Sequence, residues 1–103
     1  MAQFDIYKNP GSKAKEVPFL VSVQNDHITS RTGATVVIPL RVNMTPVETL
    51  APVMHVSGFG ACVLSTDELF AIDTALLKKS IAALSAEDRA KIRTALDKVF
   101  GDY

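Results

Sequence analysis

Apolar and polar residues alternate in short stretches along the first two-thirds of the chain, which predicts β-strands. In the first stretch, Phe4 and Ile6 share one face while Asp5 and Tyr7 share the other. Five segments carry this alternation or an apolar run and are predicted strands: Gln3–Lys8, Pro18–Gln24, Thr35–Leu40, Pro52–Val56 and Ala61–Ser65. Turn residues in Asn9–Ser12 predict a long-looped hairpin, and Ser57–Gly60 predicts a glycine-rich one.

The third segment is β-branched at four consecutive positions, Thr35–Ile38, so we expect both of its faces to be buried. Pro39 lacks the backbone N–H that a sheet neighbour would use. We therefore expect Pro39 at an edge, at a bulge or at the end of the strand.

The last part of the chain has the period of a helix. Ser85 and Asp88 resemble a capping box, with Asp in place of the usual Glu or Gln. One apolar stripe follows at helical spacing: Ile92, Ala95, Leu96, Val99 and Phe100. Gly101 stands where a C-terminal cap belongs. The pattern predicts a helix that ends near Gly101, with Val99 and Phe100 completing its core-facing stripe.

The segment Ser65–Leu84 fits two patterns. Thr66 could cap a helix in which Leu69, Ile72 and Leu76 roughly follow the helical period. The shorter stretch Ala71–Leu77 could equally form a strand, and periodicity alone does not separate the two.

Composition indicates one folded domain. The chain has 103 residues, 48% of them hydrophobic and 21% charged. Eleven basic and eleven acidic residues cancel, so we expect no direct binding to nucleic acid by this chain alone. Its start lacks a signal-peptide pattern and no apolar run could span a membrane. Cys62 is the only cysteine, which excludes an intrachain disulfide and favours the cytoplasm.

The residues offer little enzymatic chemistry. His55 is expected in the core or on a sheet face, and Cys62 as a small buried apolar residue. Asp67 and Glu68 fit the first turn of a helix better than an acid–base pair. The two histidines and the cysteine lack metal-ligand spacing. We expect no catalytic residues, no metal and no cofactor.

Several segments, read in order, resemble the CcdB-type toxins of bacterial toxin–antitoxin systems. They are "MAQFDIY" (Met1–Tyr7), "VSVQND" (Val21–Asp26), "VVIPL" (Val36–Leu40), "PVMHV" (Pro52–Val56), "STD" (Ser65–Asp67) and the helix-forming Ala83–Gly101. No single motif is specific, but their order and spacing together are.

The resemblance implies a mainly β fold: a five-stranded antiparallel sheet curled like a small barrel, shared with MazF-type toxins, with a C-terminal helix. For Ala71–Leu77 it favours the strand. It also implies a two-fold homodimer that is not an enzyme. Such a toxin binds the DNA gyrase A subunit and traps gyrase on cleaved DNA, and a CcdA-like antitoxin neutralises it.

The resemblance places the gyrase-binding tip at the end of the helix. Without a gap in the helix, Phe100 and Gly101 take the aromatic and glycine positions, Asp102 replaces an aliphatic residue, and Tyr103 is extra. Aligned on the last residue instead, with one insertion near Ser85, Tyr103 takes the terminal place and Asp102 the glycine. We prefer the first alignment, because it keeps Phe100 and Gly101 together. Further residues match positions near this tip: Gln3, Phe4, Tyr7, Asn25 and His27.

Antitoxin binding in the family uses two connections. One is the loop after the first strand, here longer than usual and spanning Lys8–Lys15, with candidate contacts Lys8, Asn9, Lys13 and Lys15. The other is Arg41–Ala51, here shorter than usual. These changed lengths indicate a different cognate partner.

Two alternatives remain open. The Asp102–Tyr103 ending favours a non-toxic homologue that keeps the fold, binds an antitoxin and takes part in operon repression. An endoribonuclease on the same fold could recruit Arg31 and Thr66, although no acid–base pair stands beside them in the sequence.

Overall fold

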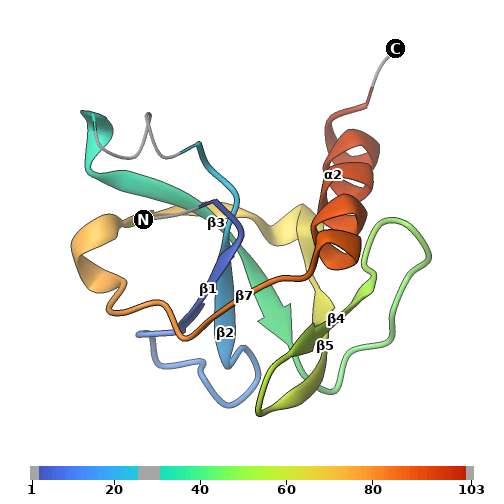
Figure 1. Ribbon diagram of the computed structural model, residues 1–103, viewed down its shortest axis with the longest axis horizontal. Helices are drawn as coiled ribbons and strands as arrows, with labels where there is room; N and C mark the ends of the chain where they lie inside the picture. The colour runs from blue at the N-terminus through green and yellow to red at the C-terminus, as the bar shows by residue number, and fades with distance from the viewer. Residues whose placement is uncertain (1–2, 26–30, 102–103) are drawn as a thin grey trace.

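The computed structural model describes residues 3–25 and 31–101. Within them, seven strands are followed by a C-terminal helix (Figure 1). The strands are β1 (Asp5–Lys8), β2 (Phe19–Ser22), β3 (Ala34–Arg41), β4 (Val53–Val56), β5 (Gly60–Leu64), β6 (Phe70–Asp73) and β7 (Ala82–Ala83). Two short 3₁₀ helices, η1 (Thr66–Glu68) and η2 (Thr74–Leu76), flank β6, and the helix α2 spans Ala86–Phe100.

All strand pairs are antiparallel, in the order β4-β5-β3-β2-β1-β7, and β6 also pairs with β3. The long strand β3 therefore joins two halves of the sheet, with β6 beside its first residues and β5 beside its last. The sheet curls, and α2 stands beside β4 and β5 (Figure 1). The expected mainly β, barrel-like fold with a C-terminal helix is confirmed. Besides the five strands predicted from the residue pattern, β6 forms where the resemblance favoured a strand, and β7 is an additional short strand.

The strand boundaries differ slightly from the expected ones. The first strand begins at Asp5, because the chain turns at Phe4, whose φ is 70°. Both predicted hairpins form, since β1 pairs with β2 and β4 with β5. In the second hairpin, Gly58 and Gly60 have φ of 81° and 124°, which glycine adopts without steric cost.

Pro39 lies inside β3 rather than at the end or edge of a strand. It pairs with Leu20 of β2, and its carbonyl accepts a hydrogen bond from Ser65 N at 2.9 Å on the opposite side. In an antiparallel strand, the nitrogen of a residue faces the same side as its carbonyl. Pro39 falls between the residues that pair with β6 and those that pair with β5, so its missing N–H removes no bond of either ladder.

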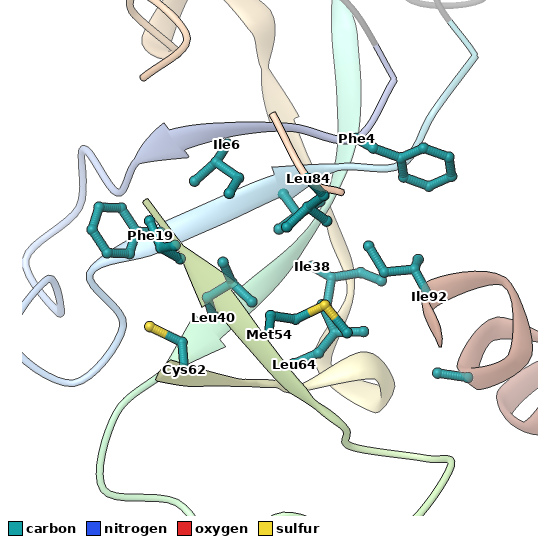
Figure 2. Close-up of a cluster of buried hydrophobic side chains, with 13 residues drawn as sticks. Phe4, Ile6, Phe19, Ile38, Leu40, Met54, Cys62, Leu64, Leu84 and Ile92 are labelled. Carbon is teal, nitrogen blue, oxygen red and sulfur yellow. The ribbon is translucent and has the colours of Figure 1, made fainter. Parts of the chain in front are cut away.

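Both faces of the β1–β2–β3 region are buried, as the run in β3 predicted. The main core lies between the curled sheet and α2 (Figure 2). It consists of Phe4, Ile6, Phe19, Val21, Ile38, Leu40, Met54, Val56, Cys62, Leu64, Leu84, Ile92 and Ala95. A smaller core on the opposite face consists of Tyr7, Val17, Leu20, Val37 and Leu77. The alternation in β1 thus separates two cores rather than a core from solvent.

The ambiguous segment forms no long helix. Ser65 precedes only the short η1, with no side-chain cap, and the strand that the resemblance favoured over Ala71–Leu77 forms as β6. It ends at Asp73, whose carboxylate accepts the N–H of Ala75 at 3.0 Å and starts η2. The strand is therefore shorter than expected at its end, because a local side-chain acceptor competes with the sheet.

Candidate functional site

Helix α2 carries the residues that the resemblance assigns to target binding. Its N-terminal cap is Ser85, as predicted, and Ser85 Oγ accepts the N–H of Asp88 at 3.1 Å. The second half of the expected capping box is absent, because the Asp88 carboxylate is directed elsewhere. Asp88 Oδ2 accepts the backbone N–H of His55 in β4 at 3.1 Å.

The N-terminal half of α2 is bonded to the open edge of β4. The Val53 carbonyl and the His55 N–H face away from β5, and side chains of α2 bind both. Lys91 Nζ donates to the Val53 carbonyl at 3.4 Å, and it lies 3.5 Å from Asp88 Oδ1. Asp88 is only 5% exposed. A strand edge and a helix are thus joined by a buried carboxylate that binds both a cation and an N–H.

The C-terminal end of α2 projects from the body of the molecule (Figure 1). Ile92 and Ala95 are buried, Leu96 and Val99 are half-buried, and Phe100 is 66% exposed. The prediction that Phe100 completes the core-facing stripe is therefore wrong, because the helix leaves the sheet before its last turn. Gly101 caps the helix with φ 67° and ψ 167°, a combination close to exclusive to glycine.

The turn before β1 lies against α2 through Phe4. Phe4 is 5% exposed, and the guanidinium of Arg93 lies over its ring, 5.1 Å from the ring centre. Gln3 Nε2 donates to the Val23 carbonyl at 2.9 Å, which holds the exposed Gln3 beside the end of β2. The positive φ of Phe4 costs roughly 1–2 kcal/mol, a strain that its burial and these contacts must offset.

The structure brings together part of the set assigned to the tip. Phe4 lies beside α2, whereas Tyr7 is 2% exposed in the core on the opposite face of the sheet. Gln3 precedes Phe4 and is bonded to Val23 at the end of β2. Asn25 is exposed where the chain leaves β2. Three members of the set, His27, Asp102 and Tyr103, lie outside the described residues. Sequence reasoning missed Arg93, although its spacing of seven from Phe100 placed both on one helix face.

The loop assigned to antitoxin binding borders an open groove of about 370 Å³. The groove is lined by Asn9, Gly11, Ser12, Lys13, Val17, Leu20, Pro39, Arg41, Glu68 and Phe70. Asn9 shapes the loop, since its Oδ1 accepts the Gly11 N–H and its Nδ2 donates to the Val17 carbonyl, both at 2.9 Å. Lys8, Lys13 and Lys15 are exposed.

A bidentate ion pair is part of the lining of this groove. Arg41 Nε and Nη2 donate to the two carboxylate oxygens of Glu68 at 2.6 and 2.9 Å, and Ser65 Oγ also donates to Glu68. These hydrogen bonds, from Arg41 first and Ser65 second, lower the pKa of Glu68. Glu68 in turn raises the pKa of Arg41. Glu68 thus serves as an ion-pair partner of β3 rather than as a helix-dipole residue.

Three other candidate residues, Cys62, His55 and Thr66, can be placed in the structure. Cys62 is buried as expected, and burial raises the pKa of its thiol. His55 is exposed on a sheet face and not in the core. Thr66 is 0% exposed, so it offers no surface contact for the ribonuclease alternative. Among residues 3–25 and 31–101, no cluster of three or more metal-binding side chains occurs, and no helix there could span a bilayer.

A depression of about 690 Å³ lies between the β4–β5 turn and the start of α2. Its lining includes the exposed His55 and Phe59 together with Glu87 and Lys91. Phe59 is held by edge-to-face contact with Phe19, with 4.8 Å between ring centres. The depression is lined by both acidic and basic side chains, and none of its lining residues favours one class of ligand.

Comparison with known proteins identifies one family. The model of the CcdB protein family matches residues 3–101. Comparison with curated protein sequences finds no match.

Similar solved structures share the fold at low identity. A mycobacterial endoribonuclease in complex with its cognate antitoxin superposes with a TM-score of 0.81 at 17% identity, over 98% of this chain and 95% of that one. A MazE–MazF structure from Deinococcus radiodurans gives 0.72 at 14%, over 98% and 95%. The Mycobacterium tuberculosis toxin MazF-mt6 gives 0.71 at 15%, over 99% and 100%.

Proposed function

Because the chain belongs to the CcdB family of toxins of toxin–antitoxin modules, we propose that it acts by binding the DNA gyrase A subunit and trapping gyrase on cleaved DNA. It acts in the cytoplasm as a two-fold homodimer, which places two copies of the α2 tip side by side for a two-fold target.

One observation carries this proposal: the aromatic ring at the end of α2 is exposed while the rest of the helix is anchored. A phenylalanine that is 66% exposed beside a glycine cap has no role in the core of this chain. Exposed aromatic side chains on a rigid element are typical binding anchors, since burying the ring on a partner releases water from a large apolar surface. We assign Gly101, Asp102, Tyr103, Asn25, His27 and Gln3 to the same surface.

A CcdA-like antitoxin is the second proposed partner. It binds the β1–β2 loop and the groove beside it, through Lys8, Asn9, Lys13 and Lys15. A disordered acidic segment that folds on binding suits exposed lysines around an open groove.

Binding to the purified gyrase A subunit tests the proposal. We expect the wild-type protein to bind, to arrest growth of a gyrase-proficient bacterium and to accumulate cleaved DNA. Phe100→Ala should weaken binding by about thirtyfold or more, as for other aromatic anchors. Phe59→Ala is the matched control, because Phe59 is also exposed but lies on the β4–β5 turn. Wild-type protein without binding or toxicity would contradict the proposal.

A second candidate is a non-toxic homologue that binds an antitoxin and represses its operon with it. Asp102 favours this candidate, because it puts a charge where the family has an aliphatic residue, and burying an unpaired carboxylate is costly. Replacing Asp102–Tyr103 with one isoleucine separates the two candidates. Toxicity gained only in that variant would support the second, and a toxic wild type would exclude it.

A further inference from the structure

One face of α2 carries two arginines in line with the exposed Phe100. Arg89, Arg93 and Phe100 follow one another at spacings of four and seven, which places them in one row along the helix. All three are exposed, and the half-buried Leu96 lies in the same row. Arg93 and Phe100 are two turns apart, about 10 Å along the axis. A single partner surface can contact both side chains.

Phe4 holds the side chain of Arg93 in place. The guanidinium stacks over the Phe4 ring at 5.1 Å, and the ring is fixed because Phe4 is buried in the main core. Backbone hydrogen bonding from Phe4 N to the Ser22 carbonyl ties this turn to β2. An arginine that is already ordered before binding loses less conformational entropy when it forms a contact.

Apart from its contact with the Phe4 ring, Arg93 has no oppositely charged partner within the described part of the chain. Ion pairs among residues 3–25 and 31–101 join Arg41 to Glu68 and Lys91 to Asp88, and neither involves Arg93. Asp97 lies one turn further along the helix but forms no ion pair with Arg93. A stacked guanidinium keeps its N–H donors at its edge, where they can bind a carboxylate in bidentate geometry.

We propose that Arg93, held by Phe4, is a specificity-determining residue of the target-binding surface and pairs with a carboxylate of the target protein beside the pocket that receives Phe100. This rests on the proposed function and names the chemistry that the gyrase A subunit must supply. Charge complementarity favours a protein carboxylate over DNA phosphate, because Asp97 lies close by and the chain has no net positive charge. Phe4 acts through Arg93 and is a positioning residue.

The test measures affinity for the purified gyrase A subunit at two salt concentrations. Arg93→Gln should weaken binding by about ten- to a hundredfold and reduce its salt dependence, because a charged hydrogen bond is lost. Lys98→Gln, which removes a charge from the opposite face of α2, is the control and should change affinity less than about twofold.

Phe4→Leu separates positioning from simple destabilisation. It keeps an apolar side chain in the core but removes the ring beneath the guanidinium, so affinity should fall about two- to fivefold in the wild-type background. In the Arg93→Gln background the same change should have no further effect on affinity. Equal losses in both backgrounds would show that Phe4 acts through folding and would overturn its positioning role.

The remaining outcomes are distinguishable. If the wild-type protein does not bind the gyrase A subunit, the proposed function fails and this inference fails with it. If the wild type binds and Phe100→Ala does not, but Arg93→Gln binds like the wild type, the inference alone is wrong. Loss of self-association, or of binding to duplex DNA, in Arg93→Gln with gyrase affinity unchanged would assign the arginine to another contact and also overturn it.

Discussion

The two ends of α2 have opposite relations to the rest of the molecule. At the N-terminal end, Ser85 caps the helix, Asp88 is buried, and both Asp88 and Lys91 bind the backbone of β4. At the C-terminal end, Val99 is half-buried, Phe100 is exposed, and Gly101 ends the helix in a conformation that suits glycine.

This difference assigns two tasks to one helix. The N-terminal half contributes to stability, because removing a contact there leaves a buried group unpaired. The C-terminal turn contributes little to stability and is free to serve binding. Substitutions along α2 should therefore change stability most at the start of the helix and affinity most at its end.

The largest effect on stability is expected at Asp88. Asp88→Ala should lower the free energy of unfolding by about 2–3 kcal/mol, because the His55 N–H and the Lys91 ammonium both lose their acceptor. Urea denaturation at neutral pH measures the change. Asp88→Asn, which keeps an acceptor oxygen for His55, should cost less.

Asp97→Ala is the matched control for that measurement, since Asp97 is an exposed aspartate near the other end of the same helix. Its effect should stay below about 0.5 kcal/mol. Equal losses in Asp88→Ala and Asp97→Ala would remove the distinction between the two ends.

The next effect is expected at the cap. Ser85→Ala should cost about 1 kcal/mol, because the Asp88 N–H loses the Ser85 hydroxyl as its acceptor. Ser85→Asp should restore most of the stability, since aspartate is a good cap and favours the positive end of the helix dipole. Thermal unfolding of the three proteins gives the comparison, and an unchanged melting temperature in Ser85→Ala would show that the cap is not needed.

The smallest effect on stability is expected at Phe100. Phe100→Ala should change the free energy of unfolding by less than about 0.5 kcal/mol, because the ring is mostly exposed in the wild type. The same denaturation experiment decides this point independently of any binding partner. A loss above about 1.5 kcal/mol would show that the ring packs within the folded protein and would contradict its role as a free anchor.

Local patterns in the sequence predicted much of the fold. Ser85 and the spacing of Ile92, Ala95 and Leu96 located α2, and the glycines of Ser57–Gly60 located the β4–β5 hairpin. The β-branched run in β3 correctly predicted a strand with two buried faces. These features depend on neighbouring residues alone, so the sequence contains all the information that they need.

The features that escaped prediction depend on contacts between distant residues. Helical spacing grouped Phe100 with Ile92, but where the helix leaves the sheet is set by packing against distant parts of the chain, η1 among them. Asp88 fitted a local cap, and its bond to His55 requires a strand thirty-three residues earlier in the chain. The exposed Arg93 looked like any solvated charge until the fold placed the ring of Phe4 beneath it.

The bond between α2 and β4 also bears on how the protein behaves at high concentration. A strand with free N–H and carbonyl groups along its outer edge can recruit a strand from another molecule and so begin aggregation. Asp88 and Lys91 occupy the His55 N–H and the Val53 carbonyl on that edge. The helix that carries the proposed binding tip therefore also shields β4 from strand addition, and mutating its buried carboxylate should make the protein more prone to aggregate.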